Sequence, residues 1–478
     1  MNHALVEHFR LPQELIHVRL RGPLSREPGY FRFAADTICY GRSASGSRTP
    51  RAHGKLYDTA GDVVAEGGAI RLPFDPDEVV DNLRHERYLA GGGRSARESP
   101  YLRSLYYGWL RPLVPAPVRR RLQRALLGDW DRIPFPQWPV DGTVDRLLER
   151  LLAVSMTALG LARVPFIWFW PDGATACAIM THDVDDRAGL DFCSELMALD
   201  DAVAIKSSFQ IVPEGRYPVA DALLHDIRAR GFEVNVHDLN HDGRLFTSRE
   251  EFSRRVERIN AWGRRYQARG FRSGQLYRNQ AWLSELAFSY DMSVPSVAHL
   301  DPQRGGCCTL TPFFIGKVLE LPLTTIQDYS LFYVLRDYST RLWTRQADEI
   351  AARHGLLSFL VHPEHVIEAS ARKTYRALLE YLAGLRETRN VWIPLPREVD
   401  RWWRQRRALT LVRDGDGWRI EGDGKERARL AFATVTDGKL AFTIDGAPVD
   451  GPRIDAGTIR HASIEMPSIE KPTIGERR

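Results

Sequence analysis

The chain has 478 residues, of which 27% are charged and 44% are hydrophobic, with a formal net charge of +5 at pH 7. This length predicts two or three domains, and the composition is that of a soluble globular protein. A charge of +5 is small for the length, so nucleic acid is not expected as a partner.

Targeting signals and membrane spans are not expected from the sequence. Residues 1–15 carry charges and a proline without a continuous apolar core, unlike a secretory signal. The most apolar window, 147–170, is interrupted by charges and a proline and does not fit a spanning helix. Five cysteines form no Cys-x-x-Cys pattern, which favours reduced thiols and a cytoplasmic protein.

Residues 1–95 are predicted to form a small mixed α/β domain. Segments 17–21, 30–40 and 55–65 have strand character, and 76–88 resembles a helix. No residue pattern in this region indicates chemistry.

Residues 96–170 are predicted to be a linker followed by an amphipathic helical region. Its first part mixes aromatic residues with arginines, among them Tyr106, Tyr107, Trp109, Arg119, Arg120, Arg121, Arg124, Trp130, Phe135 and Trp138. Such a block could lie on an anionic membrane as a peripheral contact, or beside a charged glycan. We favour the alternative, a solvated basic helix whose aromatic neighbours pack onto the main domain.

From residue 171 to 407 the chain alternates strand-like and helix-like segments. The expected strands are 176–181, 207–212, 233–237, 270–272, 292–294, 318–321 and 356–362, with a last strand at 390–395. Helical patterns at 187–199, 219–229, 248–269, 280–287, 345–353 and 397–407 lie between or after them. This alternation predicts βαβ units and a mostly parallel sheet that is closed or nearly closed, with all strand carboxyl ends at one rim.

The first of these strands runs straight into three carboxylates. Because alternate side chains share a face of a strand, Asp183 and Asp185 should point the same way. Asp186 stands where an N-cap is needed for the helix that follows. A capping loop would explain one aspartate but not the Asp-x-Asp pair.

Further polar residues follow other strands. His237 and His241, four residues apart, can meet one ion from a tight loop, and with a carboxylate they make the three-ligand set of a catalytic zinc or related site. Arg272 ends the next strand, where its guanidinium can bind and orient a carboxylate. An ordinary surface salt bridge is an almost equally good interpretation of this residue. His362, fixed by Pro363 in extended geometry, is a candidate general acid. His365 carries no comparable argument.

These motifs, in this order, resemble those of the NodB-homology polysaccharide deacetylases, carbohydrate esterase family four, over roughly residues 174–395. The resemblance implies a distorted (β/α) barrel that removes N- or O-acetyl groups from sugars with a divalent metal: zinc first, with Co²⁺, Ni²⁺, Mn²⁺ or Fe²⁺ as alternatives. It implies Asp183 as base, Arg272 as the residue that orients it, and His362 as acid. The implied metal ligands are Asp185, His237 and His241.

The sequence also departs from that family. Thr181-His182-Asp183-Val184-Asp185 stands where most members have Thr-Phe followed by adjacent aspartates, and Arg272 lacks the proline usual two positions later. The family's fourth motif has only Asp328 as a candidate. Three alternatives therefore stay open: an amidase acting on a small C–N substrate, a non-catalytic polysaccharide-binding or assembly protein, and a non-haem iron oxygenase, which the α/β alternation disfavours.

The remaining residues form two expected units. Residues 408–450 read as a small β appendage with Asp-Gly turns, and 451–478 as a disordered tail. The expected partner is an acetylated glycan or a lipid- or nucleotide-linked sugar precursor, used in building a cell-surface or secreted polysaccharide.

Overall fold

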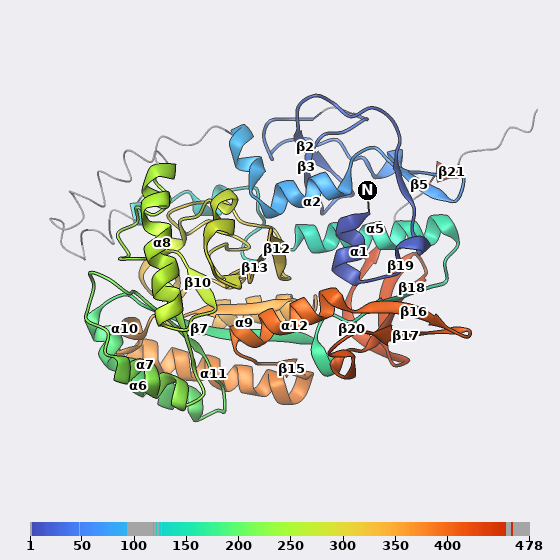
Figure 1. Cartoon of the computed structure of the whole chain (residues 1–478). Helices are drawn as coiled ribbons and strands as arrows, with labels where there is room; N and C mark the ends of the chain where they lie inside the picture. The colour runs from blue at the N-terminus through green and yellow to red at the C-terminus, as the bar shows by residue number, and fades with distance from the viewer. Residues whose placement is uncertain are drawn as a thin grey trace, which may run out of the picture.

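The computed structural model describes residues 2–46, 48–92, 118, 121, 124–125, 127–455 and 460–461. Two regions make up the molecule (Figure 1). One is a curled sheet with helices on its outside, built from the middle of the chain. The other combines the N-terminal segment, one long helix and the C-terminal strands, which lie together although they are far apart in sequence.

The curled sheet has nine strands and is almost entirely parallel. Its strands are β7 (Ala176–Val184), β8 (Ser208–Ile211), β9 (Glu233–His237), β10 (Gly270–Arg272), β11 (Tyr290–Asp291), β12 (Phe313–Ile315), β13 (Val318–Glu320), β14 (Leu356–Leu360) and β15 (Val391–Trp392). Their order is β12-β13-β11-β10-β9-β8-β7-β14, with β15 beside the start of β7, and only β12 runs antiparallel to its neighbour. The α/β architecture expected from the alternation is therefore present.

The two ends of this sheet meet. Residues 323–325, which follow β13, lie against β14: the Thr325 amide donates to the Ser358 carbonyl at 3.3 Å, and the Ser358 amide donates to Thr324 Oγ1 at 2.9 Å. These hydrogen bonds join residues 323–325 to β14 without forming a regular pair of β-strands. The result fits the expected distorted barrel, with the carboxyl ends of its parallel strands at one rim.

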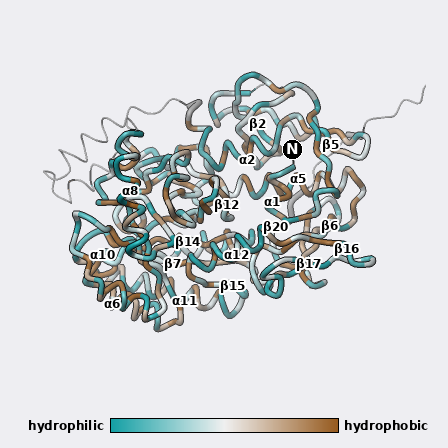
Figure 2. Tube along the Cα trace, in the orientation of Figure 1, coloured by the Kyte–Doolittle hydropathy of each residue, from teal (hydrophilic) through white to brown (hydrophobic). Residues whose placement is uncertain are grey.

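Helices connect the strands and cover the outside of the sheet. They are α6 (Arg187–Asp201), α7 (Asp221–Ala229), α8 (Arg249–Arg265), α9 (Arg341–Ala351), the short α10 (Pro363–Val366) and α11 (Ala369–Arg389). Hydrophobic and hydrophilic residues mix along α6, α8 and α11 (Figure 2), as expected of helices with one buried face. Asp186 caps α6 as predicted, because its side chain accepts from the Gly189 amide at 3.0 Å.

The hydrophobic core of the second region continues into the curled sheet, where Cys177, Ile179, Leu319 and Leu356 belong to the same cluster. From the N-terminal segment come α1 (His3–Phe9), β1 (Val18–Leu20), β2 (Gly29–Arg32), β3 (Ile38–Gly41), β4 (Val64–Glu66), β5 (Ala69–Leu72) and α2 (Pro76–Arg84). The helix α5 (Thr143–Leu159) and the strand β6 (Arg163–Ile167) follow. The C-terminal part supplies α12 (Pro396–Ala408), β16 (Thr410–Asp414), β17 (Gly417–Glu421), β18 (Leu430–Thr436), β19 (Lys439–Ile444), β20 (Ala447–Asp455) and β21 (Arg460–His461).

Several predicted boundaries need correction. The strand expected at 292–294 is the two-residue β11 at Tyr290–Asp291, and the Val294 amide instead donates to the Glu320 carboxylate at 3.0 Å. The segment 280–287 is a 3₁₀ helix over Gln280–Glu285, not an α-helix. Residues 30–40 are not one strand but the hairpin of β2 and β3.

The predicted boundary at residue 408 cuts through a packed unit. β18 pairs antiparallel with β6, giving a sheet in the order β20-β19-β18-β6, so the C-terminal strands are completed by residues 163–167. β20 continues to Asp455 and β21 pairs with β4, which corrects the tail predicted to start at 451. The rest of that predicted tail lies outside the described residues.

The basic aromatic block is described only in part. Tyr106, Tyr107, Trp109, Arg119 and Arg120 lie outside the described residues. Phe135 is buried against Tyr30 and Tyr88, and Trp130 packs on Trp138 with ring centroids 4.6 Å apart. Phe135 therefore packs onto the main body, in line with the favoured interpretation of the block's aromatic residues.

No helix within the described ranges combines the length and apolar character needed to cross a bilayer. All five cysteines are buried with free thiols.

A candidate metal and proton-transfer site

The carboxyl end of β7 places two aspartates toward the same centre. Asp183 Oδ2 lies 3.5 Å and Asp185 Oδ1 lies 3.2 Å from Nε2 of His237. The alternation of the strand accounts for this arrangement, since the intervening Val184 points to the other face. The spaced pair therefore acts as a single polar face, as the sequence predicted.

His182, which replaces an aromatic residue of the resembled family, lies on the opposite face of β7. Its Nδ1 is 2.9 Å from the Val361 carbonyl oxygen, and its Nε2 is 3.3 Å from Asp200 Oδ2. The Tyr375 hydroxyl donates to the other oxygen of Asp200 at 2.5 Å. His182 therefore belongs to a buried hydrogen-bond network on the other face of β7 and does not contact the carboxylates of the site.

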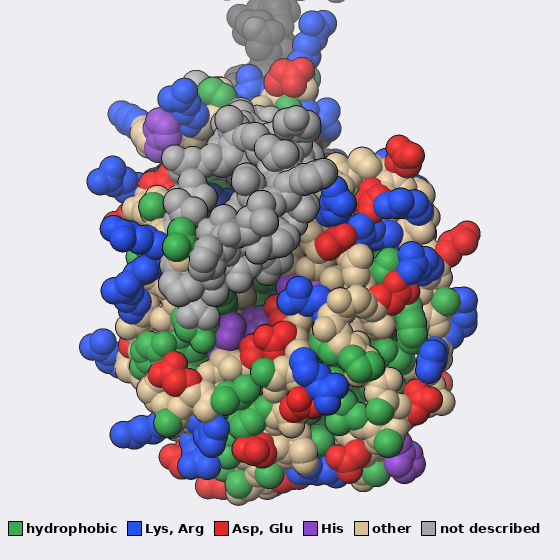
Figure 3. All heavy atoms as spheres, turned by 90° about the vertical axis from the view of Figure 1, so that its left-hand side faces the viewer, with side chains coloured by type: hydrophobic (Ala, Val, Ile, Leu, Met, Phe, Trp, Pro, Cys, Tyr) green, Lys and Arg blue, Asp and Glu red, His purple; other side chains and the backbone are tan. Residues whose placement is uncertain are grey.

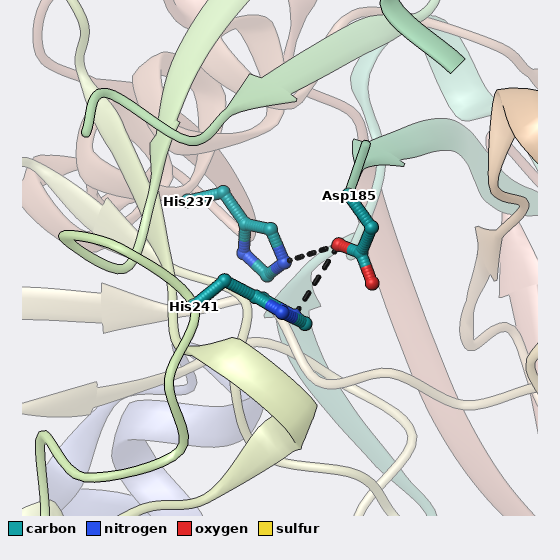
Figure 4. A group of neighbouring side chains, drawn as sticks. All are labelled: Asp185, His237 and His241. Carbon is teal, nitrogen blue, oxygen red and sulfur yellow. Dashed lines mark ion pairs between the residues drawn. The ribbon is translucent and has the colours of Figure 1, made fainter. Parts of the chain in front are cut away.

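His237 and His241 face Asp185 together (Figure 4). His237 ends β9, and His241 follows in the tight loop before α8, with a left-handed φ of 54°. Their Nε2 atoms lie 3.2 and 3.3 Å from the same oxygen, Asp185 Oδ1, and both histidines are buried. The residues predicted to share an ion are thus brought together.

The donor atoms of this group fit a divalent cation. Zinc ligands lie at about 2.0–2.2 Å from the ion, so two of them in a tetrahedral arrangement are roughly 3.4 Å apart, close to the observed separations. His237 Nδ1 lies 3.1 Å from the Arg272 carbonyl oxygen, which only accepts; Nδ1 therefore carries the proton and Nε2 keeps its lone pair. Asp185 Oδ1 and His237 Nε2 are buried without a hydrogen-bond partner among the described residues.

Electrostatics keep Asp185 ionised. Burial opposes its charge, but the neighbouring imidazoles of His241 and His237 outweigh it electrostatically and hold the pKa of Asp185 well below its usual range. For His237 burial also opposes the charge, yet Asp183 and Asp185 raise the pKa of its imidazole. A cation at this position would replace the protons that otherwise balance these carboxylates.

Arg272 holds Asp183 from inside the barrel. Its Nη1 donates to Asp183 Oδ1 at 2.9 Å and to Thr181 Oγ1 at 2.8 Å, and its Nε donates to the Met292 carbonyl at 2.9 Å. Arg272 is fully buried, so the surface salt bridge considered from the sequence is excluded. With Oδ1 occupied, Asp183 Oδ2 is the oxygen that faces the centre of the site.

His362 lies beside Asp185, next to the carboxylate oxygen that does not face His237 and His241. It follows β14 in extended conformation, as its proline predicted, and its Nε2 is 4.0 Å from Asp185 Oδ2. Its Nδ1 is 2.6 Å from Asp328 Oδ1. Burial works against the charged ring, but Asp328 raises the pKa of His362 well above its ordinary value.

Asp328 and His365 form a second carboxylate–histidine group with His362. The sequence offers Asp328 only as a candidate for the family's fourth motif, and it assigns no role to His365. Asp328 Oδ2 lies 2.9 Å from His365 Nδ1 and also accepts from the His362 amide at 2.8 Å, while Oδ1 accepts from the Tyr329 amide at 2.8 Å. Burial favours the neutral acid, but His362 and His365 hold the pKa of Asp328 well below its usual range. The three-residue spacing of His362 and His365 at a helix start was the available signal.

Figure 3 looks onto the left-hand side of Figure 1, where histidine and acidic side chains reach the surface together near the middle of the face. Among the described residues, two groups could hold a metal by composition: Asp185 with His237 and His241, and Asp328 with His362 and His365. The carboxylate of the second group already has four hydrogen-bond contacts, whereas Asp185 Oδ1 and His237 Nε2 of the first group have no hydrogen-bond partner among the described residues.

No protein-family model and no curated protein matches the chain. Solved structures similar to it include a candidate polysaccharide deacetylase from Mycobacterium smegmatis, at 16% identity and a TM-score of 0.41, covering 52% of this chain and 97% of that one. The allantoinase Puue has 13% identity and a TM-score of 0.38, covering 49% and 92% of the two chains. A candidate polysaccharide deacetylase from Pseudomonas aeruginosa PAO1 has 12% identity and a TM-score of 0.37, covering 48% and 91%. Likenesses this distant carry no argument about activity, which depends on the site geometry.

Proposed function

We propose that this chain is a divalent-metal-dependent hydrolase that removes an acetyl group from an N- or O-acetylated sugar. One observation carries the proposal: the ligand atoms of Asp185, His237 and His241 converge, with Asp183 beside His237 and His362 beside Asp185. The sugar as substrate class rests on the order of motifs that resembles carbohydrate esterase family four.

Two side chains of this chain would move protons on opposite sides of the bound acetyl group. Asp183, oriented by Arg272 through Oδ1, accepts a proton from water at Oδ2. His362, kept protonated by Asp328, donates from Nε2 to the departing amine or hydroxyl. When bound at Asp185, His237 and His241, zinc or a similar cation supplies Lewis acidity that lowers the pKa of water and polarises a carbonyl group.

The test combines metal analysis of the purified full chain with acetate release from N-acetylated and O-acetylated oligosaccharides. We expect one tightly bound divalent ion and acetate release that chelation abolishes and added Zn²⁺ or Co²⁺ restores. Bound metal without acetate release from any oligosaccharide would favour an amidase acting on a small C–N substrate. No bound metal and no release would favour a non-catalytic binding protein.

We also propose that the protein acts in the cytoplasm on a sugar precursor. Peripheral contact of the basic aromatic block with an anionic membrane is the alternative that we do not favour. Co-sedimentation with anionic vesicles at low salt tests it, and no binding would remove it.

A further inference from the structure

Arg272, which holds Asp183, also depends on a backbone carbonyl outside its own strand. Its Nη1 donates to Asp183 and Thr181, both on β7. Its Nε donates to the Met292 carbonyl oxygen at 2.9 Å. The guanidinium is therefore fixed both by β7 and by the segment that follows β11.

Two acidic side chains determine the course of that segment. The Ser293 amide donates to Asp291 Oδ2 at 3.0 Å, and the Ser293 hydroxyl donates to Asp291 Oδ1 at 2.8 Å. The next amide, that of Val294, donates to Glu320 Oε1 at 3.0 Å. In a regular strand these amides would donate to carbonyl groups of neighbouring strands. The two acids therefore end β11 after Asp291 and fix the backbone that carries the Met292 carbonyl.

The same segment is bonded to the strand of Arg272. The Ser293 hydroxyl oxygen accepts from the Ser273 amide at 2.9 Å, and the Met292 amide donates to the Phe271 carbonyl at 3.0 Å. These contacts lie directly before and after Arg272 in the chain. A displacement of the segment would thus move both the carbonyl bonded to Nε and the backbone that carries the arginine.

One proton is required between the two acids. Asp291 and Glu320 are buried and hydrogen-bond to each other, which needs a proton on one of them because ionised carboxylates only accept. Of their four oxygens, Glu320 Oε2 lacks a donor among the described residues. Burial raises the pKa of Glu320 well above its ordinary value, and the charge of Asp291 raises it further. These contacts place the proton on Glu320.

We propose that Asp291 and a protonated Glu320 are positioning residues: together they fix the segment 292–294, whose Met292 carbonyl keeps Arg272 in the orientation that binds Asp183. This inference rests on the proposed function, because it requires Asp183 to act as the base.

The test compares two changes of Glu320 by kcat and KM for acetate release and by the Co²⁺ affinity of the metal-stripped full chain. Glu320→Gln keeps an acceptor for the Val294 amide and a donor for Asp291, so its kcat should stay within a few-fold of wild type. Glu320→Met keeps the length of the side chain but removes both groups, and we expect kcat to fall by about 100-fold. KM and Co²⁺ affinity should change little in either variant. Glu149→Met is the matched control, because it makes the same change at a buried glutamate on α5 and should leave kcat nearly unchanged.

A double variant separates positioning from general damage to the fold. If Glu320 acts through Arg272 on Asp183, Glu320→Met should cause no further loss of kcat in the Asp183→Asn background. A loss of the same size in both backgrounds would overturn the inference.

Ser293→Ala replaces Glu320→Met if the latter fails to fold. It removes the hydroxyl between the Asp291 carboxylate and the Ser273 amide, and we expect kcat to fall by about tenfold, again without a further loss in the Asp183→Asn background.

Unchanged kcat in the folded variant, Glu320→Met or its replacement, would overturn the inference and leave the proposed function standing. Equal losses in Glu320→Gln and Glu320→Met would also overturn it, because a proton donor at this position would then not matter. A wild-type chain that releases no acetate would overturn the inference together with the proposed function.

Discussion

Two groups of one aspartate and two histidines lie side by side at the rim of the barrel, and their carboxylates have different partners. Asp185 faces the Nε2 atoms of its two histidines through one oxygen that lacks a hydrogen bond within the described structure. Asp328 faces Nδ1 atoms, and its oxygens already accept four hydrogen bonds. The two groups have the same composition, but we expect different chemistry from them. The first has ligand atoms without hydrogen bonds, which suits a cation. In the second, the carboxylate is fully hydrogen-bonded, which suits a histidine that must keep its proton.

The largest effect is expected from His237→Ala. Removing one of three proposed ligands should eliminate the bound metal and lower acetate release by at least about 10,000-fold. Metal content and turnover are measured on the same preparation, with the exposed His225→Ala on α7 as control. Full metal content in His237→Ala would contradict the assignment of the first group.

Asp183→Asn should separate metal binding from turnover. The amide cannot accept the proton, so the rate should fall toward the upper end of the range of about 100- to 10,000-fold expected for loss of a general base. The metal should remain, because Asp183 is not among the proposed ligands. Full activity in this variant would refute Asp183 as the base.

Asp328→Asn should affect the proton donor without removing the metal. We expect a loss toward the lower end of that range, about 100-fold. Asp328 raises the pKa of His362, so without it His362 loses its proton at lower pH, and the decline of activity on the alkaline side should move to lower pH. A pH–rate profile of kcat measures this, and an unmoved alkaline limb would argue against His362 as the acid.

The smallest effect is expected from His365→Gln. The glutamine amide can still donate to Asp328, so activity should fall by less than about tenfold, far below the loss of a general acid. Metal content should be unchanged, in contrast to His237→Ala. Loss of metal from His365→Gln would mean that the second group also holds a cation, and the distinction between the groups would fail.

Much of this site could be predicted because its residues follow strands. Asp183, Asp185, His237, Arg272 and His362 each stand at a strand end or directly after one, and parallel strands bring those ends to one rim. The alternation of side chains along a strand also predicted that Asp183 and Asp185 share one face of β7 and that Val184 lies on the other.

Residues on irregular segments were harder to predict. Asp328 and His365 meet through the 328–335 segment and the start of α10, and the Met292 carbonyl reaches Arg272 where β11 has already ended. No periodicity relates such residues, since their contacts depend on loop conformation. The sheet shared by β6 and β18 escaped prediction for a similar reason, because its strands are far apart in sequence.

The sequence by itself determined the α/β alternation and which chemical groups arrive at the rim, because buried strands have a recognisable apolar pattern and a fixed direction for alternate side chains. Only the tertiary structure decided which carboxylate faces lone pairs and which faces donors. That distinction depends on the direction of individual hydrogen bonds, such as His237 Nδ1 to the Arg272 carbonyl and His362 Nδ1 to Asp328, between residues 35 and 34 positions apart.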